Sequence, residues 1–293
     1  MKQKLFSILA LLLMAVTGAW AQGYTVTLKD GTEDADKWTI TPKEGLSEGD
    51  QVTIQYNGRL KVKGVKATSD AAAPSVPDGA LSGVFSVSST KKVNFSKGNL
   101  RYASSKWSFF DNQYDYYTGY SADAWDKFGW STSATTYGMN TSALNSYYSG
   151  DFVDWGATMG AGWFTLSSDE WTYLLNTRTV NGGTGDGKSY TKGQSVDGKL
   201  GVVIYPDNYT GEVYSGSNWA TFESAGCVFL PAAGIRSGSS LSYLGTRGSY
   251  WSASPNGAGI AYNVLFTSGA LSPAYSNGRC YGASVRLVRE VTE

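Results

Sequence analysis

The sequence predicts an α+β fold in which a small all-β module precedes a larger domain with few helices. Three observations lead to this prediction. Several short segments alternate apolar and polar residues with a period of two, as half-buried strands do. One segment carries the apolar spacing of an amphipathic helix. The chain also contains 36 glycines, 20 tyrosines and 10 tryptophans, a turn-rich and aromatic-rich composition that favours β structure.

The chain begins with the features of a secretory signal. Lys2 and Lys4 supply positive charge, an apolar run extends over 5–16, and Ala19-Trp20-Ala21 fits a signal peptidase site. We expect residues 1–21 to be a signal peptide and the mature chain to be exported to the periplasm, the cell surface or the extracellular space. No later apolar run approaches the roughly 20 residues of a membrane helix, so direct membrane insertion is not expected.

Residues 22–67 predict the small β module. The segments YTVTL, KWTIT, QVTIQY and LKVKGVK alternate apolar and polar residues, and Asn57-Gly58 between two of them is a hairpin signal. Residues 68–83 are rich in small residues, contain two prolines and show no periodicity, so they predict a linker. The larger domain then occupies 84–293.

Within the larger domain, LSSDEWTYLLNTR (166–178) is the clearest helix. Ser167 and Glu170 form a capping-box pattern, and Trp171, Leu174 and Leu175 give one apolar face. Four segments are predicted as strands: 198–206, 227–234, 261–269 and 280–290. In the last of these, Tyr281, Ala283, Val285 and Leu287 should point to one side and Gly282, Ser284, Arg286 and Val288 to the other. The preceding stretch, SPAYSNGR, is expected to be a loop.

Charge and residue types exclude several classes of function. The formal net charge is zero, which argues against nucleic acid or an anionic membrane surface as a partner. The absence of histidine removes Ser-His-Asp and Cys-His catalysis and the commonest metal ligand. We therefore expect no catalytic residue, no cofactor and no metal. Cys227 and Cys280 could form one disulfide in an exported protein, or remain two separate buried thiols.

Seven phrases along the larger domain resemble one known family. They are FGW (128–130), DWG (154–156), WFTLSSDEWTYLLNTR (163–178), GVVIYPDNY (201–209), FLPAAGIRSGSSL (229–241), GSYWSASP (248–255) and RCYGASVRLV (279–288). In this order and spacing they are similar to the Fibrobacter succinogenes major paralogous domain family. The resemblance covers about 85–290. It implies a C-type-lectin-like fold, related to the formylglycine-generating enzyme and sulfatase-modifying-factor domains.

The resemblance leaves an enzymatic alternative open. The formylglycine-generating enzymes oxidise a substrate cysteine with closely spaced cysteines, whereas the two cysteines here are far apart in sequence. A carboxylate-pair hydrolase is the second enzymatic alternative, with Asp151, Asp154, Asp169 and Glu170 as candidates. Asp169 and Glu170 have a simpler explanation, because acidic residues in the first turn of a helix stabilise its dipole.

Ligand binding is the principal prediction, because the resemblance implies a ligand face built from late loops and strands. Tyrosines among Ser, Gly and Asn are also typical of antibody-like binding surfaces. The candidate ligand-binding residues are Tyr243, Tyr250, Asn256, Ala258, Ile260, Asn263, Thr267, Tyr275, Ser276, Asn277 and Tyr281. We expect Tyr275, Asn277 and Tyr281 to be the most exposed, and Trp251, Tyr262 and Arg286 to be structural. The ligand is an unknown protein or glycan.

Two further expectations concern the same stretch. Residues 242–285 contain no Asp or Glu, so a lectin-type calcium site is not expected there. Asp186, Asp197 and Asp207 lie in loops elsewhere and could hold an ion, although exposed turn residues are the simpler interpretation.

Some members of the family are targets of diversity-generating retroelements, which randomise adenines in asparagine codons. Such codons cannot yield Lys, Glu, Gln, Met or Trp, and none of these occurs in 252–285. Turns and buried strands avoid long charged side chains for other reasons. Diversification of this stretch and a fixed binding face are therefore both retained.

Overall fold

The computed structural model describes residues 10–12, 24–26, 38–40, 54–56, 78–160 and 162–291. The chain divides into two compact units, Met1–Ala73 and Pro74–Glu293. In the first unit, β1 (Ala10–Leu12) pairs antiparallel with β2 (Tyr24–Val26), and β3 (Trp38–Ile40) pairs with β4 (Ile54–Tyr56). Strands β2, β3 and β4 fall within three of the predicted alternating runs. The signal cleavage site and the Asn57-Gly58 turn lie outside the described residues.

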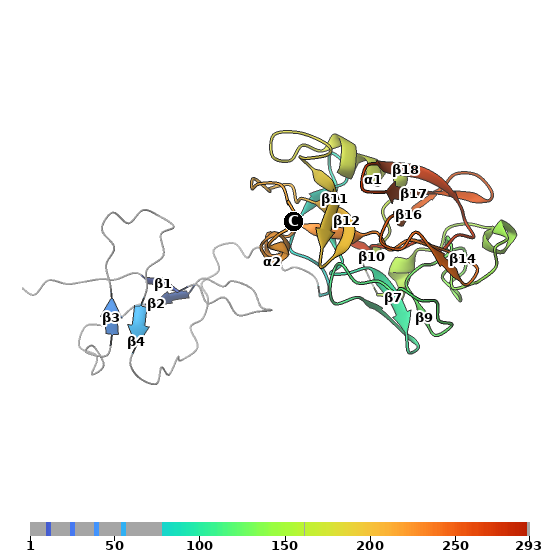
Figure 1. The fold of residues 1–293 in the computed structure, drawn as a ribbon, viewed down its shortest axis with the longest axis horizontal. Helices are drawn as coiled ribbons and strands as arrows, with labels where there is room; N and C mark the ends of the chain where they lie inside the picture. Colours follow the sequence, from blue (N-terminus) through green and yellow to red (C-terminus); the bar gives the residue numbers. More distant parts are fainter. Residues whose placement is uncertain are drawn as a thin grey trace, which may run out of the picture. The chain divides into compact units, whose positions relative to one another are not determined.

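The second unit consists mostly of β-sheets with few helices (Figure 1). This agrees with the many strands and few helices that the sequence predicts. Its strands are β5 (Phe85–Ser86), β6 (Lys92–Phe95), β7 (Leu100–Ala103), β8 (Lys106–Phe109), β9 (Ala124–Trp125), β10 (Trp163–Phe164), β11 (Tyr190–Val196), β12 (Lys199–Ile204), β13 (Val228–Pro231), β14 (Ile235–Ser237), β15 (Ser240–Ser242), β16 (Gly248–Pro255), β17 (Ile260–Phe266), β18 (Leu271–Gly278) and β19 (Val288–Glu290).

The helical segments are short. They are α1 (Ser168–Thr172), α2 (Trp219–Ser224), the 3₁₀ turns η2 (Asn145–Tyr148) and η3 (Trp155–Thr158), and the π turn η4 (Tyr173–Thr177). None of the helices in the described part of the chain is long and apolar enough to span a bilayer. The sheets have the strand orders β10-β19-β6-β5, β8-β7-β9, β11-β12-β13, β14-β15 and β16-β17-β18.

The predicted helix is confirmed, including its capping box. Ser167 Oγ accepts a hydrogen bond from Glu170 N at 3.2 Å, and Glu170 Oε2 accepts one from Ser167 N at 2.8 Å. Trp171, Leu174 and Leu175 are fully buried in one hydrophobic cluster with β6, β12, β13, β16 and β17. The helix is shorter than predicted, because the last turn widens into the π turn before Arg178.

The C-terminal part of the predicted linker belongs to the second unit. Ala80 forms a β-bridge with Ser96, and Leu81 N donates to Phe95 O at 2.7 Å. Gly83 lies so close to the backbone of Gly226 that a Cβ at position 83 would clash with the Gly226 carbonyl. Residues 78–83 are therefore packed structure, which corrects the predicted end of the linker at 83.

The predicted loop and strand near the C-terminus are exchanged in the structure. Residues 271–278, expected to be a loop, form strand β18 at the edge of its sheet. All the side chains of β18 are half-buried or exposed, so the strand shows no hydrophobic alternation. As an edge strand it also tolerates Pro273 and the register shift opposite Val264. The sequence pattern that reveals a half-buried strand is therefore missing.

The predicted strand 280–290 is regular only over β19. Before it, Gly282, Ala283 and Ser284 make isolated bridges to Arg236, Phe128 and Tyr250. The expected alternation is still visible in the packing: Ala283, Val285 and Leu287 enter one hydrophobic cluster, while Val288 enters the other. Residues 282–288 are buried on both sides, so this stretch runs between the two clusters and has no solvent face.

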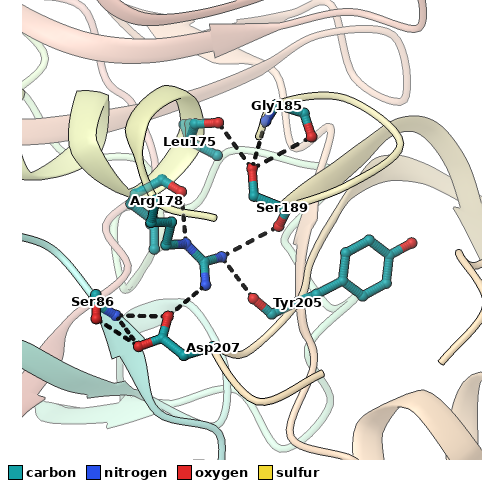
Figure 2. Close-up of polar contacts among 8 residues, drawn as sticks. Ser86, Leu175, Arg178, Gly185, Ser189, Tyr205 and Asp207 are labelled. Atoms are coloured by element: carbon teal, nitrogen blue, oxygen red, sulfur yellow. Dashed lines mark hydrogen bonds and ion pairs between the residues drawn. The ribbon is translucent and has the colours of Figure 1, made fainter. Parts of the chain in front are cut away.

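A buried arginine joins three parts of the second unit (Figure 2). Arg178 Nη1 donates to Asp207 Oδ1 at 2.9 Å, while its other nitrogens donate to the carbonyl oxygens of Leu174, Ser189 and Tyr205. Asp207 also accepts from Ser86 N and Oγ. Burial lowers the pKa of Arg178 to about 10, so the guanidinium is still charged at neutral pH. The network fastens β5, the end of the helix and the segment after β12 to one another.

Candidate ligand-binding face

Three chain segments with exposed apolar side chains meet around Asn145 in η2. Asn145 Oδ1 accepts a hydrogen bond from Cys280 N at 3.0 Å. A Cβ at Gly278 would lie 3.2 Å from the same oxygen, and a Cβ at Gly259 would lie 3.3 Å from the Asn145 side chain. The exposed side chains on these segments are Leu144, Tyr147, Ile260 and Tyr281. We call these four residues the Asn145 group.

Buried Arg279 holds the same segments together. Its guanidinium donates to the carbonyl oxygens of Tyr148, Gly150, Gly257 and Ile260 at 2.9–3.3 Å. It also stacks over the Trp130 ring, 4.1 Å from the ring centroid. Burial lowers its pKa, with Asp151 as an opposing charge. Because Arg279 already serves four carbonyl groups, it is a structural brace and not a ligand contact.

A second group of exposed aromatic residues surrounds Arg247. Its guanidinium lies 5.4 Å from the ring centroid of Tyr243 and 5.8 Å from that of Tyr275. Tyr243 is 56% exposed and Tyr275 is 44% exposed. Strand β18 connects the two groups, because it carries Tyr275 and ends at Gly278 beside Asn145. Ile260 pairs with Gly278 and Tyr275 pairs with Asn263, three residues away along each strand, so the side chains of Ile260 and Tyr275 point to opposite sides of the β17–β18 pair. We use the name candidate face for the exposed side chains of both groups, Leu144, Tyr147, Tyr243, Ile260, Tyr275 and Tyr281.

The structure divides the predicted binding residues by exposure. Tyr243, Ala258, Ile260, Tyr275, Ser276 and Tyr281 are exposed, whereas Asn256, Thr267 and Asn277 are half-buried. Asn256 Nδ2 donates to Ser276 Oγ at 2.6 Å, so these two polar side chains already have each other as partners. Thr267 lies at the other end of β17 from Ile260, roughly 20 Å away at the usual rise per residue. Thr267 is therefore not part of the candidate face.

The prediction is wrong for Tyr250 and Asn263, which are fully buried. The Tyr250 hydroxyl donates to Pro231 O at 2.9 Å and accepts from Asn99 Nδ2, and burial raises its pKa. Asn263 Nδ2 donates to Ser249 Oγ. The physical reason is the strand order: β17 lies between β16 and β18, and Ser284 bridges β16 at Tyr250. Exposed side chains remain on the edge strand β18 and at the start of β17, where Ile260 is exposed.

Two expectations about structural residues hold. Trp251 is fully buried, and Arg286 is fully buried with Nη2 donating to Gln113 Oε1 at 2.8 Å. Tyr262 is half-buried. Asn277 is less available than expected, because its Oδ1 accepts from Gly278 N at 3.0 Å.

Sequence reasoning missed Leu144, Tyr147 and Arg247. The signal in the sequence is weak: Leu144 and Tyr147 stand in TSALNSYYSG, a stretch of small polar residues without strand or helix periodicity. An aliphatic and an aromatic residue in such a stretch are expected on the surface, but only the fold brings them next to 259 and 278–281. Their partnership with the C-terminal segments depends on the long-range contact of Asn145 with Cys280.

The acidic residues proposed for a hydrolase have structural roles or lie apart on the surface. Asp154 accepts from Gly156 N, Thr165 N and Thr165 Oγ1 at 2.8–3.1 Å, which caps η3 and ties it to the strand after it. Glu170 completes the capping box and forms an ion pair with Lys91 at 2.7 Å. Asp151 and Asp169 are exposed.

Metal ligands do not gather in the described part of the chain, where no three Cys, Asp or Glu side chains lie together. Asp207 is engaged by Arg178 and Ser86, and Asp186 pairs with Lys192. Cys227 and Cys280 are free, buried thiols, which corrects the disulfide interpretation. Cys227 packs among Val203, Phe229 and the tyrosines of its hydrophobic cluster, whereas Cys280 lies beside Asn145.

No family model matches the chain, and neither a curated protein nor a solved structure matches it. Function is therefore inferred from the geometry of the chain's own residues.

Proposed function

We propose that this chain is an exported, non-catalytic ligand-binding protein of the Fibrobacter succinogenes major paralogous domain family. In this proposal the second unit has a C-type-lectin-like fold, and the candidate face recognises a protein or glycan as an adhesin or receptor would. The observation that supports it most directly is the exposure of six large apolar or aromatic side chains, five of them on segments held by Arg279 and Asn145 and the sixth, Tyr243, beside Arg247.

Aromatic side chains on a braced surface suit recognition for a physical reason. Tyrosine buries a large area on binding and loses little conformational entropy, so it is enriched at the energetic centres of interfaces. Its ring also stacks on sugars. The segments that carry the candidate face are already fixed by hydrogen bonds to buried groups, which reduces the ordering cost of binding.

The proposal predicts that three tyrosines carry most of the affinity. The purified chain is screened on a glycan array and a panel of immobilised cell-surface proteins, and the strongest signal is titrated. We expect Tyr147→Ser, Tyr275→Ser and Tyr281→Ser together to weaken binding by roughly 30-fold or more, the scale of one interfacial hot spot. The melting temperature should hardly change, because all three side chains are exposed.

The matched control is Val213→Ser, which removes an exposed apolar side chain of the second unit outside the candidate face. The control should bind like the parent chain. Full binding by the triple variant, or equal loss in both variants, would contradict the proposed face. Turnover of any captured small molecule would instead favour an enzyme.

Diversification of this face makes a separate prediction about individual positions. In the stretch that resembles a variable region, Ala258, Ile260, Ala274, Tyr275, Ser276 and Tyr281 are exposed. Val264 and Ala283 are fully buried in the two main hydrophobic clusters, where random side chains would destabilise the fold. Deep sequencing of codons 240–293 in a growing population should therefore show substitutions at the exposed positions and none that persist at 264 or 283. An invariant segment would mean a fixed binder.

A further inference from the structure

Arg247, in the turn between β15 and β16, has a guanidinium group without a polar partner in the described part of the chain. It takes part in none of the ion pairs there. Its Nε is buried and unpaired. Its Nη1 and Nη2 donate no hydrogen bond to a described residue either, yet they are not among the buried unpaired atoms of this half-buried residue, so these two nitrogens reach solvent.

Two exposed aromatic rings flank this guanidinium. Its central carbon lies 5.4 Å from the ring centroid of Tyr243 and 5.8 Å from that of Tyr275, within the range of cation–π attraction. The rings hold the cation, but they do not satisfy its terminal N–H donors. An anion that reaches Nη1 or Nη2 would therefore form a charge-assisted hydrogen bond in surroundings from which water is partly excluded.

The backbone of the turn fixes Tyr243 relative to Arg247. Arg247 N donates to Tyr243 O at 3.1 Å. Tyr243 has a φ of 60°, a left-handed conformation that a residue with a bulky side chain keeps only when its surroundings enforce it. The turn is also tied to the segment before β14, because Gly245 N donates to Ala232 O and Gly234 N donates to Arg247 O, both at 2.8 Å. This arrangement reduces the ordering cost of binding.

The charge of the surrounding stretch indicates which ligand fits. Residues 242–285 contain Arg247 and Arg279 and no Asp, Glu or Lys. Arg279 is buried and already donates to four carbonyl groups, so Arg247 is the cation of this stretch with open donors. One positive charge between two aromatic rings matches a ligand with one negative group attached to a ring. Acidic peptides are instead recognised by clusters of arginines.

We propose that Tyr243, Arg247 and Tyr275 form a subsite for an acidic sugar. The carboxylate or sulfate of the sugar accepts hydrogen bonds from Arg247 Nη1 and Nη2, whose planar fork suits two oxygens of one anion. The sugar ring packs on a tyrosine ring. The inference rests on the proposed function, because Tyr243 and Tyr275 belong to the candidate face, and it names the ligand class of that face as an acidic glycan.

The test titrates the full chain with defined sugars and follows binding by calorimetry. Sialyllactose carries a carboxylate, sulfated lactose carries a sulfate, and lactose is their neutral counterpart. Trigalacturonate is compared with its methyl ester in the same way. We expect an acidic sugar to bind roughly tenfold or more tightly than its neutral counterpart, the scale of one hydrogen bond to a charged group. This preference should weaken as salt is raised, and the tighter of the acidic sugars identifies the anion as carboxylate or sulfate.

Arg247→Gln and Arg289→Gln are a matched pair of variants. Arg289 is also half-buried and lies 5.6 Å from the ring centroid of Trp163, but that ring is 8% exposed and offers no surface to a sugar. Arg247→Gln should bind the acidic sugar no more tightly than the neutral one, whereas Arg289→Gln should bind like the parent chain. Because the Arg247 side chain donates no hydrogen bond to a described residue, its replacement should hardly change the melting temperature. Arg247→Lys keeps the charge without the fork and should retain part of the preference.

Three outcomes would overturn the proposal. They are equal or undetectable binding of the acidic and neutral sugars by the parent chain, an undiminished preference in a folded Arg247→Gln variant, and binding of triglutamate as tight as that of the acidic sugars, which would indicate an acidic peptide. The triple tyrosine variant separates this inference from the proposed function. Loss of a captured ligand in the triple variant, with no change in Arg247→Gln, would keep the candidate face and reject the acidic-sugar subsite. Full binding by the triple variant would reject the candidate face itself.

Discussion

Replacing Asp207 with Ala should lower the free energy of unfolding by about 3 kcal/mol, the lower end of the range for removing one partner of a buried ion pair. The substitution leaves Arg178, whose side chain is 2% exposed, without its counter-charge. It also removes the acceptor for Ser86 N and Oγ, so β5 loses its attachment (Figure 2). Asp207 is itself 27% exposed, and water can partly replace it, which is why the lower end applies.

A double-mutant cycle separates the ion pair from the other contacts. Arg178→Met, Asp207→Ala and the double variant are unfolded in urea at neutral pH, with Asp207→Asn as the matched variant that keeps the shape and one acceptor. We expect the double variant to be more stable than the sum of the single losses implies, because it no longer buries an unpaired charge. A loss below about 0.5 kcal/mol for Asp207→Ala would show that the network contributes little.

The elements that could be predicted are those that bury one face and whose apolar residues show this pattern within a short stretch of sequence. The helix at 166–178 was identifiable because both its capping residues and its apolar face occur within a few positions of one another. Strands β12 and β13 lie within predicted segments, and β17 overlaps one from Ala261 to Phe266, because continuous or alternating apolar residues fill them. In each case, short-range sequence and tertiary packing demand the same structure.

The errors occur where the segments packed around a residue, and not the residue's own type, decide whether its side chain is buried. Tyr250 and Tyr275 are the same residue type in similar Ser-rich surroundings, yet one is fully buried and the other is exposed. The difference comes from the surroundings, since Tyr250 packs in a hydrophobic cluster and its strand is bridged by Ser284, whereas Tyr275 lies on the edge strand β18. No local pattern carries this information, and the same holds for the contact between Asn145 and Cys280.

The arginines of the second unit show that residue type alone does not identify a ligand contact. Arg178, Arg236, Arg279 and Arg286 are all buried and donate mainly to backbone carbonyls or amide oxygens. Long irregular segments leave many carbonyl groups without a strand partner, and a planar guanidinium can satisfy several of them at once. Even so, Arg236 Nη2 and Arg286 Nε have no hydrogen-bond partner among the described residues, so this arrangement does not satisfy every donor.

Alkaline pH should unfold the second unit through the cluster around Cys227. This thiol is fully buried beside Phe229, Tyr205 and Tyr214, and burial raises its pKa from 9.0 to about 12. Burial likewise raises the pKa of Tyr209, which packs against the same cluster, to about 12. In the unfolded chain these groups ionise near their ordinary pKa values of about 8.5–10. The unfolded state therefore loses protons in a range of pH in which the folded state keeps them.

The direction in which stability changes with pH follows from this difference in bound protons between the folded and the unfolded state. The contribution of the protonated Cys227 thiol to the free energy of unfolding is fully present below about pH 9, and it is lost as the pH rises towards 12. For Cys227 alone, the change across this range amounts to roughly 4 kcal/mol, a large share of the stability of a typical domain. Burial lowers the pKa of Arg178 and Arg286 to about 10, which acts in the opposite direction, but only above that pH.

In the interval from pH 8.5 to 10, the Cys227 thiol ionises in the unfolded chain while most tyrosines keep their protons, and Cys280, whose pKa burial also raises, acts in the same direction. Urea unfolding of the reduced chain should show stability falling by about 1 kcal/mol or more across this interval, since the folded state retains the Cys227 proton. Cys227→Ala provides the control: its small cavity costs the same at every pH, so the variant starts less stable but loses less as the pH rises. Parallel pH profiles for the parent chain and the variant would mean that the Cys227 thiol does not couple to folding, and that Cys280 and the tyrosines govern alkaline unfolding.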